Sequence, residues 1–502
     1  MTAASSTPTI PSGLAALEAR LKQDFRWLGL PAKRWVPAAP KSDVHDVLDV
    51  AIVGGGMAGM ALAAALRNLG VQAPVFDRAP EGFEGPWATT ARMETLRSPK
   101  ELTGPALGFG ALTFRAWFES QFGVAAWNAL DKIPRLQWAE YLRWYRRVLA
   151  LDVRNRQRVL AIDPQADGTV RLALADETRD GAPYEVLARH VVLATGRDGL
   201  GGPWVPAWAA ALPRDRWAHS ADDWDAAALA GKRVAVIGGG ASAMDSAATA
   251  LEAGAARVDL LIRRAELPLV NKGKGAGNPG IAHGFSSLPD EWKWRFRHYI
   301  NVQQVPPPHG STLRVSRHAN AHFHLGAPVR SVSVRGDGAL RIDTAKGALA
   351  TDFLIFCTGF RPDWTQRPEF DRFASQVRLW QDRFVPEPGQ EDGELAQSPD
   401  LGPLFEFQEK TPGACPGLSR IHCFCYPSAL SHGAVAGDIP QISDGARRLA
   451  QGLAGQLFVE DAPLHFAAME RYAEPELFGD EWTPADFPTD EADDEIAEDA
   501  QP

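Results

Sequence analysis

Two glycine-rich turns constrain the fold of this chain more than any other feature of its sequence. Residues 50–60 read VAIVGGGMAGM, and residues 233–246 read RVAVIGGGASAMDS. In each stretch a β-branched apolar run leads into closely spaced glycines and then into an alanine-rich segment. This order of strand, tight turn and helix is typical of the unit that binds the phosphates of a dinucleotide. The chain is therefore expected to contain two such units.

The first turn has glycine at the three positions that such a unit requires, Gly54, Gly56 and Gly59. Gly54 permits the turn, Gly56 lets the backbone approach a pyrophosphate, and Gly59 lets the helix pack closely on the strand. The helix then presents free N–H groups and its positive dipole end to the phosphates. The next strand, APVFD, ends in Asp77, which is placed to accept a hydrogen bond from a ribose 2′-OH.

The second turn has the same context. The residues at the three corresponding positions are Gly238, Gly240 and Ala243, and Ser242, directly before Ala243, is a further candidate contact. The following strand, RVDLLIRR, ends in Arg263 and Arg264, where a site for NAD has an acid. A guanidinium suits the 2′-phosphate of NADPH, so Arg263 is predicted to select NADPH over NADH. The alternative, that both arginines only cap the edge of a strand, stays open.

Two further apolar strands end in Thr–Gly. HVVLATGRDG contains Thr195–Gly196, and DFLIFCTGFRPD contains Thr358–Gly359. Such strand ends return the chain to the cofactor crevice of a doubly wound sheet. Together the four motifs predict an α/β chain with two nested Rossmann-like (doubly wound) domains, one for a flavin and one for a nicotinamide cofactor. The predicted parts are an N-terminal extension (1–44), the first part of the FAD domain (45–205), the NADPH domain (206–355), the return of the FAD domain (356–460) and an acidic, disordered tail (461–502).

The composition argues against membrane and nucleic-acid partners. The longest apolar run, 51–66, is too short and too rich in glycine to span a membrane, and the N-terminus lacks a secretory signal. The net charge of −10 comes from residues 472–502, which hold 12 Asp or Glu and no Lys or Arg, so no basic stripe is left for nucleic acid. We expect this tail to be solvated rather than a docking arm.

The cysteine and histidine patterns predict neither disulfides nor a metal site. The 4 cysteines have no disulfide or zinc spacing, which suits a reducing cytoplasm. HANAHFH, at 318–324, has three histidines but no recognised metal-site spacing, so it is predicted to be a strand at the edge of a sheet.

The order of the glycine and Thr–Gly motifs resembles that of the flavoproteins with two dinucleotide-binding domains. Within them, roughly residues 45–455 are most similar to the flavin-containing monooxygenases and the lysine/ornithine N-hydroxylases. The segments 133–149 (IPRLQWAEYLRWYRRVL), 267–273 (LPLVNKG) and 431–440 (SHGAVAGDIP) resemble segments of the N-hydroxylases. GPWATTARME, at 85–94, resembles the Gly-x-Trp segment that lies against the isoalloxazine in both groups.

The chain also departs from both groups. In RDRWAHSADDW it keeps the histidine of the flavin-containing monooxygenase fingerprint as His219, but Asp223 stands at the aromatic position and Trp224 follows it. In METLRSPK, Glu94 replaces the glutamine of the N-hydroxylases, and Lys100 comes one residue late for their substrate lysine. The identity of the substrate is therefore not carried over.

The resemblance implies an NADPH-dependent flavin monooxygenase. NADPH would reduce FAD, O₂ would add at C4a of the reduced flavin to give a (hydro)peroxide, and a small soft nucleophile, predicted to be an amine nitrogen, would take one oxygen. Baeyer–Villiger or sulfide oxygenation, an NAD(P)H–flavin reductase and a non-enzymatic flavin sensor are the alternatives. The partners are then a small-molecule substrate and O₂, and the sequence leaves open whether the chain forms a homo-oligomer.

The resemblance also supplies candidate site residues. Asn271 is expected to orient a neutral amine near the flavin, with a plain turn asparagine as the equal alternative. Arg92 would suit the anionic peroxide of a Baeyer–Villiger enzyme, and Trp87 is expected to form a wall of the flavin site rather than ordinary core. The remaining candidates are Gly437 and Asp438 beside the flavin, and Lys100 and His432 beside the substrate.

Overall fold

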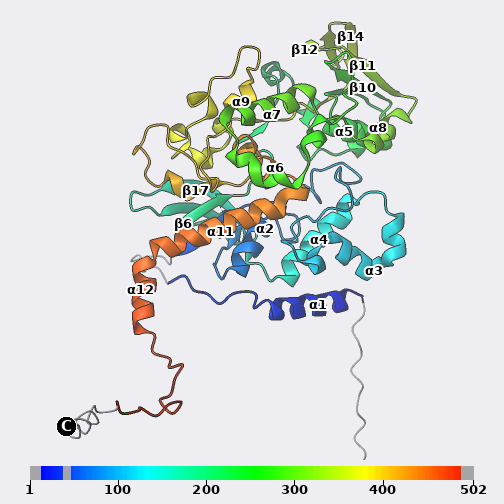
Figure 1. Cartoon of the computed structure of the whole chain (residues 1–502). Coiled ribbons are helices and arrows are strands. Elements are labelled where there is room, and N and C mark those ends of the chain that lie inside the picture. Colours follow the sequence, from blue (N-terminus) through cyan, green and yellow to red (C-terminus); the bar gives the residue numbers. More distant parts are fainter. Residues whose placement is uncertain (1–12, 38–46, 488–502) are drawn as a thin grey trace, which may run out of the picture. The chain divides into compact units, whose positions relative to one another are not determined.

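The computed structural model, drawn in Figure 1, describes residues 13–37 and 47–487. In it each glycine turn follows a parallel strand and opens a helix. The first joins β1 (Val47–Val53) to α2 (Met57–Asn68), and the second joins β9 (Arg233–Ile237) to α5 (Ala241–Glu252). The chain divides into two units at Leu457 and Phe458, and the first unit contains every sheet of the described residues.

The first sheet has seven strands in the order β3–β2–β1–β6–β5–β4, with β17 beside β6. The strands β1, β2, β3, β6 and β17 are parallel, and β4 and β5 continue the sheet in antiparallel fashion. The further bounds are β2 Val75–Phe76, β3 Val153–Arg154, β4 Gln157–Pro164, β5 Val170–Asp176, β6 Ala182–Leu193 and β17 Ile421–Cys423. Because β17 comes after the whole second sheet in the chain, a returning segment completes the first sheet.

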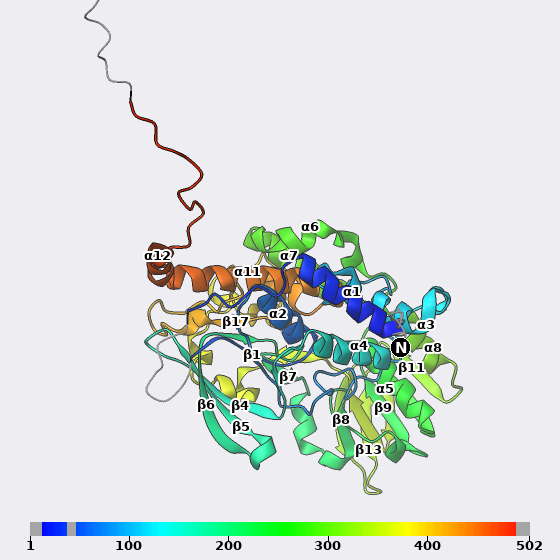
Figure 2. The same ribbon diagram turned by 90° about the horizontal axis from the view of Figure 1, so that it is seen from below.

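The second sheet is entirely parallel, in the order β11–β10–β9–β15–β8. Its other strands are β8 Trp217–His219, β10 Arg257–Ile262, β11 Ala321–Leu325 and β15 Phe353–Phe356. A three-stranded antiparallel meander precedes β15 and consists of β12 Val329–Val334, β13 Leu340–Thr344 and β14 Gly347–Thr351. The chain passes from the first sheet to the second through β7 (Gly201–Pro203) and returns through β16 (Phe360–Pro362), and these two strands pair with each other. Figure 2 shows β4, β5 and β6 on one side of this unit and β8, β9 and β13 on the other.

Burial on both faces explains why β1 reads as a continuous apolar run. Val50 and Ile52 belong to a core that also includes α2 and α11, whereas Ala51 belongs to a second core with Val191. Alternate residues of a strand point to opposite faces, so a strand covered on both sides is apolar throughout. This is the pattern that the predicted fold requires.

Ten further α-helices occur among the described residues. Their bounds are α1 Gly13–Trp27, α3 Phe114–Ala129, α4 Arg135–Val148, α6 Pro279–Gly284, α7 Asp290–Gln303, α8 His309–Ser316, α9 Gly393–Ala396, α10 Ala429–His432, α11 Ile442–Glu460 and α12 Ala462–Arg471. In α4, Tyr141 and Tyr145 are fully buried and donate hydrogen bonds to the carbonyls of Leu112 and Pro105. This face of α4 is therefore ordinary core.

The predicted disordered tail needs a correction. Residues 462–471 form α12, with Asp461 as its N-cap and Pro463 in its first turn. Proline at the start of a helix supplies a φ that suits the helix and loses no hydrogen bond, a signal that the acidic composition of the later tail obscured. Residues 488–502 lie outside the described part.

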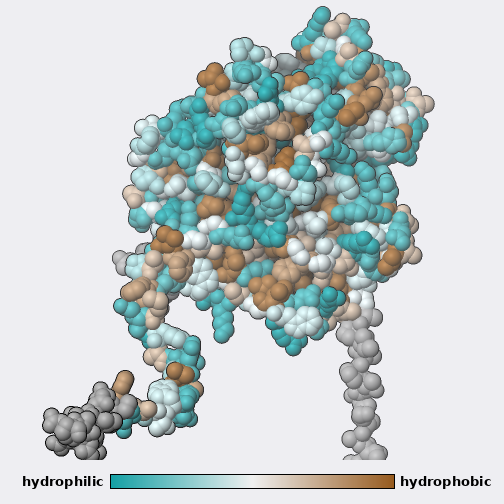
Figure 3. Space-filling model, viewed as in Figure 1, coloured by the Kyte–Doolittle hydropathy of each residue, from teal (hydrophilic) through white to brown (hydrophobic). Residues whose placement is uncertain are grey.

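The surface carries no single dominant apolar area on the face shown in Figure 3, where hydrophobic side chains lie in separate groups among hydrophilic ones. Among the described residues, no helix combines the length and the apolar character that crossing a membrane requires.

Candidate functional site

The first glycine turn has the shape of a phosphate cradle. Gly54 has a φ of +106°, and a Cβ on it would lie 2.5 Å from the carbonyl oxygen of Ala194. A Cβ on Gly59 would overlap the carbonyl oxygen of Gly54. Gly56 is different, because the nearest atom to its Cβ position, Cα of Gly85, is 3.9 Å away. The fold therefore requires glycine at Gly54 and Gly59, and the open side of Gly56 fits the approach of a pyrophosphate.

The start of α2 is free to bind an anion. Its N-cap is Gly56, which has no side chain to satisfy the N–H groups of the first turn. Asp77 follows β2 beside this turn, and its carboxylate accepts hydrogen bonds from the N–H groups of Gly55 and Ala79 at 2.6 and 2.7 Å. A carboxylate has about four lone-pair directions, so Asp77 retains capacity for a ribose hydroxyl.

The second turn repeats this geometry. Gly238 has a φ of +141°, and a Cβ on it would lie 2.6 Å from the carbonyl oxygen of Cys357. Gly240 is the N-cap of α5, and a Cβ there would meet no heavy atom within 4 Å. Ala243 is fully buried in the position of Gly59, and Ser242 is exposed in the first turn of α5. The residues of both turns thus fit dinucleotide phosphates.

The two arginines after β10 have different surroundings. Arg264 donates a hydrogen bond to the carbonyl of Val302 at 2.6 Å. The side chain of Arg263 is exposed. Arg264 is therefore held by the protein, while Arg263 is exposed, and its pairing with a 2′-phosphate stays a prediction.

The segments that follow the two Thr–Gly turns pair with each other as β7 and β16, and Trp204, directly after β7, bonds to the second turn. The N–H of Trp204 donates to the carbonyl of Gly359 at 2.9 Å, and the hydroxyl of Thr358 donates to the carbonyl of Trp204. Thr195 donates to the carbonyl of Gly199 at 3.2 Å, and the carbonyl of Gly196 accepts from the N–H of Tyr426 at 3.1 Å. These bonds hold the segment after β6 against the turn after β15, and the segment after β17 against Gly196.

Three predicted flavin contacts keep their candidate status. Trp87 is half-buried against the first core and packs edge-to-face on Trp138 with ring centroids 6.4 Å apart. Gly437 and Asp438 precede the short helix that leads into α11. Burial raises the pKa of Asp438, and the charge of Arg97 partly opposes this.

Arg92 is fully engaged by the protein. Its guanidinium donates to the carbonyls of Thr90, Ser220 and Asp222 at 2.8 to 3.0 Å and lies 3.9 Å over the ring of Trp224. These contacts fix the loop that carries Trp87 against the segment after β8. They favour a positioning role for Arg92 over the predicted catalytic one, and they give Trp224, one residue beyond the aromatic position of the fingerprint, a packing role.

Lys100 caps a helix in this structure. Its ammonium donates to the carbonyls of Trp127 and Leu130 at 2.9 and 2.6 Å, and it lies 5.2 Å from the ring of Trp127. A cation at the C-terminus of a helix stabilises its dipole and satisfies its last carbonyls. The geometry of Lys100 therefore differs from that of the predicted substrate contact.

His432 is a buried structural residue. Arg448 donates to Nδ1 at 3.0 Å, so Nε2 carries the proton and donates to the carbonyl of Gly402, also at 3.0 Å. The ring stacks on Phe405 with centroids 3.9 Å apart. Burial, assisted by the charge of Arg448, lowers the pKa of His432 to about 3. A neutral ring with both nitrogens bonded does not match the predicted contact with substrate.

Asn271 begins a turn. Its side-chain oxygen accepts from the N–H of Gly273 at 3.1 Å and caps the short helix at 272–276. This is the geometry of the turn alternative, although the amide nitrogen is not part of that bond. The histidine-rich segment lies only partly in β11, the edge strand of the second sheet: His322 and His324 are in the strand, whereas His318 precedes it. His324 Nε2 lies 2.7 Å from Oδ1 of Asp259. No group of three potential metal ligands occurs among the described residues.

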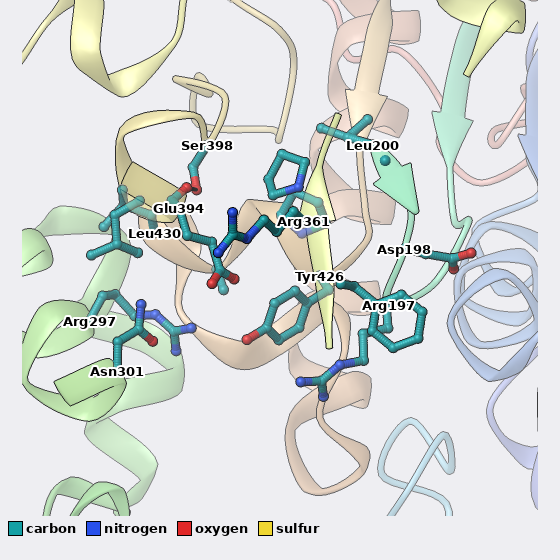
Figure 4. A pocket seen from close by; sticks show the side chains of 16 residues that line it. Arg197, Asp198, Leu200, Arg297, Asn301, Arg361, Glu394, Ser398, Tyr426 and Leu430 are labelled. Carbon is teal, nitrogen blue, oxygen red and sulfur yellow. Dashed lines mark hydrogen bonds between the residues drawn. The ribbon is translucent and has the colours of Figure 1, made fainter. Parts of the chain in front are cut away.

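A pocket that the sequence did not predict opens beyond the two Thr–Gly turns (Figure 4). Its walls come from the segment after β6, from β16, α7 and α9, and from the segment after β17. The charged side chains that line it are Arg197, Asp198, Arg297, Arg361 and Glu394. The available signal was an arginine within three residues of each Thr–Gly turn, but nothing in the sequence connected these positions with α7 and α9.

Comparisons with known proteins agree with this geometry. The family model for L-lysine 6-monooxygenase/L-ornithine 5-monooxygenase matches residues 122–294, and that for the NAD(P)-binding Rossmann-like domain matches residues 52–120. The chain is 41% identical, over 470 residues, to an FAD-dependent urate hydroxylase of Xanthomonas campestris pv. campestris, covering 93% of this chain and 98% of the relative.

This chain belongs to the FAD-dependent monooxygenases. The predicted enzyme class, the fold class and the pair of cofactors, FAD and NADPH, are thereby confirmed.

The fold is also that of more distant solved structures. An ornithine N-hydroxylase of Kutzneria, solved with reduced FAD, NADP⁺ and L-ornithine, is 18% identical with a TM-score of 0.63, covering 82% of this chain and 99% of that one. The FAD-bound cadaverine monooxygenase of Erwinia amylovora is 15% identical with a TM-score of 0.63, covering 89% and 100%.

Proposed function

We propose that this enzyme hydroxylates urate, or a closely related planar oxopurine, with NADPH and O₂. The observation that carries the proposal is the 41% identity to a urate hydroxylase along almost the whole of both chains. The glycine turns, the Thr–Gly turns and the pocket beyond them all lie within the matched length, so the likeness is not confined to a cofactor domain.

The reaction balances as a monooxygenation. Urate, O₂, NADPH and a proton give hydroxylated urate, NADP⁺ and water, with one oxygen atom of O₂ in the product and the other in water. When bound, FAD supplies the transfer of electrons from NADPH to O₂. The protein holds the two cofactors and the substrate and excludes water from the reacting atoms.

The cofactor contacts follow from the two turns. Gly54, Gly56 and Gly59 with α2 would hold the FAD pyrophosphate, and Asp77 its ribose. Gly238, Gly240 and the start of α5 would hold the pyrophosphate of NADPH, and Arg263 its 2′-phosphate. The free space at the Cβ positions of Gly56 and Gly240 supports this assignment, because no neighbouring protein atom requires glycine at either position.

A second candidate is N-hydroxylation of a small amine, as the sequence predicted. The match of residues 122–294 to the lysine and ornithine monooxygenase model favours it. An amine must be neutral to attack an electrophilic oxygen, so this reaction would need a site that removes its proton. The positive charge of the three arginines of the pocket would favour the neutral form of such an amine.

The test is substrate-coupled NADPH oxidation by the FAD-loaded enzyme. Urate, ornithine, lysine, cadaverine and a sulfide are compared at equal concentrations, with NADPH, O₂, substrate and hydrogen peroxide all measured. The proposal expects one urate consumed for each NADPH and little hydrogen peroxide. Coupled turnover of an amine, with urate inert, would establish the second candidate instead.

We also infer a cytoplasmic location, which the four free cysteines support. The predicted domain boundaries remain part of the proposal, and limited proteolysis of the holoenzyme tests them. Light scattering of the same sample decides whether the chain forms a homo-oligomer.

A further inference from the structure

The pocket beyond the Thr–Gly turns gathers positive charge that the protein leaves unpaired. Arg197, Arg297 and Arg361 line it from three different segments. Along the described chain, none of these guanidinium groups has a carboxylate within 4 Å, although many other arginines form such pairs. Nε of Arg297 is buried without a hydrogen-bond partner. Cations that lie near one another without a carboxylate in contact repel one another, and a bound anion relieves that repulsion.

The pocket also has flat walls. The guanidinium of Arg197 lies 4.8 Å from the ring of Tyr426 and 5.9 Å from the ring of Phe360, and that of Arg361 lies 4.1 Å from the ring of Trp204. Tyr426 and Phe360 line the pocket themselves. Aromatic rings and guanidinium planes favour a planar ligand, because they contact its faces over a large area.

One acceptor accompanies the donors. Glu394, at the start of α9, points into the pocket towards Arg361, whereas Asp198 points away (Figure 4). Burial and the charge of Asp392 raise the pKa of the Glu394 carboxyl, and the charges of all three arginines oppose this rise. A carboxylate among guanidinium groups can accept an N–H while the guanidinium groups donate to oxygens. This combination matches an edge that alternates N–H and C=O groups.

We propose that this pocket binds the anionic edge of the substrate, with Arg297 and Arg361 pairing with its oxygens and Glu394 accepting from a ring N–H. The proposal rests on the proposed function, because it assigns the substrate of that reaction to a site. The ligand class is a planar, anionic nitrogen heterocycle that carries carbonyl groups, of which urate is an example. Arg297, Arg361 and Glu394 would then determine specificity.

The location supports a substrate site. Tyr426 is hydrogen-bonded to Gly196, and Phe360 follows Gly359 directly, so the pocket adjoins both turns that face the cofactor crevice. The phosphates of NADPH are another source of the same anionic chemistry at this place. The two sources are separated by measuring which KM changes.

The experiment compares Arg297→Gln and Arg361→Gln with the wild type as FAD-loaded enzymes. Arg295→Gln is the matched control, because Arg295 lies on α7 two residues from Arg297, is exposed and does not line the pocket. KM for urate, KM for NADPH, the rate of flavin reduction by NADPH without urate, and FAD content are measured for each. Thermal unfolding checks that the variants are folded.

We expect KM for urate to rise roughly tenfold or more in each pocket variant, as the loss of a charge-assisted hydrogen bond implies. KM for NADPH, flavin reduction and FAD content should stay within twofold of the wild type, and the control should match it throughout. A rise in KM for NADPH with unchanged KM for urate would assign the pocket to the nicotinamide cofactor and overturn the proposal. Unchanged constants for both ligands would also overturn it.

A binding arm separates this inference from the proposed function. The stabilisation of the wild type and of the variants against thermal unfolding is measured with three ligands: urate, xanthine, and the fully methylated, neutral analogue of xanthine. If the wild type does not oxidise urate but a planar anion stabilises it and not Arg297→Gln, the proposed function fails and the pocket assignment stands. If the neutral analogue stabilises all variants equally and the anions do not, the pocket assignment fails.

Discussion

Replacing Gly240 with alanine should weaken NADPH binding without disturbing the fold. Gly240 has φ −93° and ψ −170°, which alanine adopts readily, and a Cβ there meets no heavy atom within 4 Å. The effect of the change on folding should therefore stay within about 1 kcal/mol, since the poorer N-cap and the less flexible unfolded chain oppose each other. If the free space serves the pyrophosphate, the methyl group occupies it.

The expected cost to binding is that of one methyl group forced into a close contact, about 2 kcal/mol, or roughly thirtyfold in affinity. The assay is anaerobic flavin reduction at increasing NADPH concentrations, with thermal unfolding as the check on folding. Gly310→Ala is the matched control, because Gly310 lies in the first turn of α8 and its Cβ is equally unobstructed. An unchanged dependence on NADPH in Gly240→Ala, with the fold intact, would refute the assignment of this turn.

Three further predictions concern charge and protonation. Arg263→Glu should reduce the preference for NADPH over NADH by about 1–3 kcal/mol, measured as the ratio of kcat/KM for the two cofactors, and an unchanged ratio would contradict the role of Arg263. Lys100→Met should lower the free energy of unfolding by about 1–3 kcal/mol, because Lys100 binds helix carbonyls, while KM for urate stays constant. A raised KM for urate in a stable variant would instead support the predicted substrate role of Lys100. His422 and His432 have pKa values lowered to about 3, chiefly by burial, so they stay neutral in the folded protein while the unfolded chain takes up protons below about pH 6.5. The stability that these two neutral histidines give the folded protein is therefore complete above pH 6.5 and is lost as the pH falls towards 3. Urea unfolding should show that the free energy of unfolding falls by about 2–3 kcal/mol between pH 7.5 and 5.5, and the fall should be smaller in His432→Gln.

The glycine turns were predictable from sequence because their chemistry is local. Gly54 and Gly59 are required by atoms a few residues away or on the adjacent strand, and the strand, turn and helix lie in one continuous segment. The same locality fixed the place of Arg263 after β10. The sequence alone therefore predicted two nested domains and their cofactors.

The roles of the candidate catalytic and substrate residues were harder to predict from sequence, because their contacts join distant segments of the chain. Arg92 binds carbonyls that lie 128 and 130 residues further along the chain, and His432 depends on Gly402, 30 residues earlier. A motif shows that a polar residue is present but not which carbonyl it meets. Lys100 matched the position of a family lysine to within one residue and yet bonds to the end of α3, since loop geometry decides where its long side chain reaches.

The pocket could not be predicted from sequence for the same reason. Arg197 and Arg361 follow the two Thr–Gly turns, whereas Arg297 and Glu394 come from α7 and α9. No local spacing relates these four residues, so only the folded chain brings them together. A pocket built by tertiary contacts carries no sequence motif.

The most direct test of the central claim is oxygen labelling. The FAD-loaded enzyme turns over urate with NADPH under ¹⁸O₂, and a parallel reaction is run in H₂¹⁸O. The hydroxylated product of each reaction is trapped early, and its ¹⁸O content is measured by mass spectrometry. The account predicts one ¹⁸O atom per product molecule from O₂ and none from water. Label that comes from water, or hydrogen peroxide formed in equal amount to the NADPH consumed while urate remains unchanged, would contradict it.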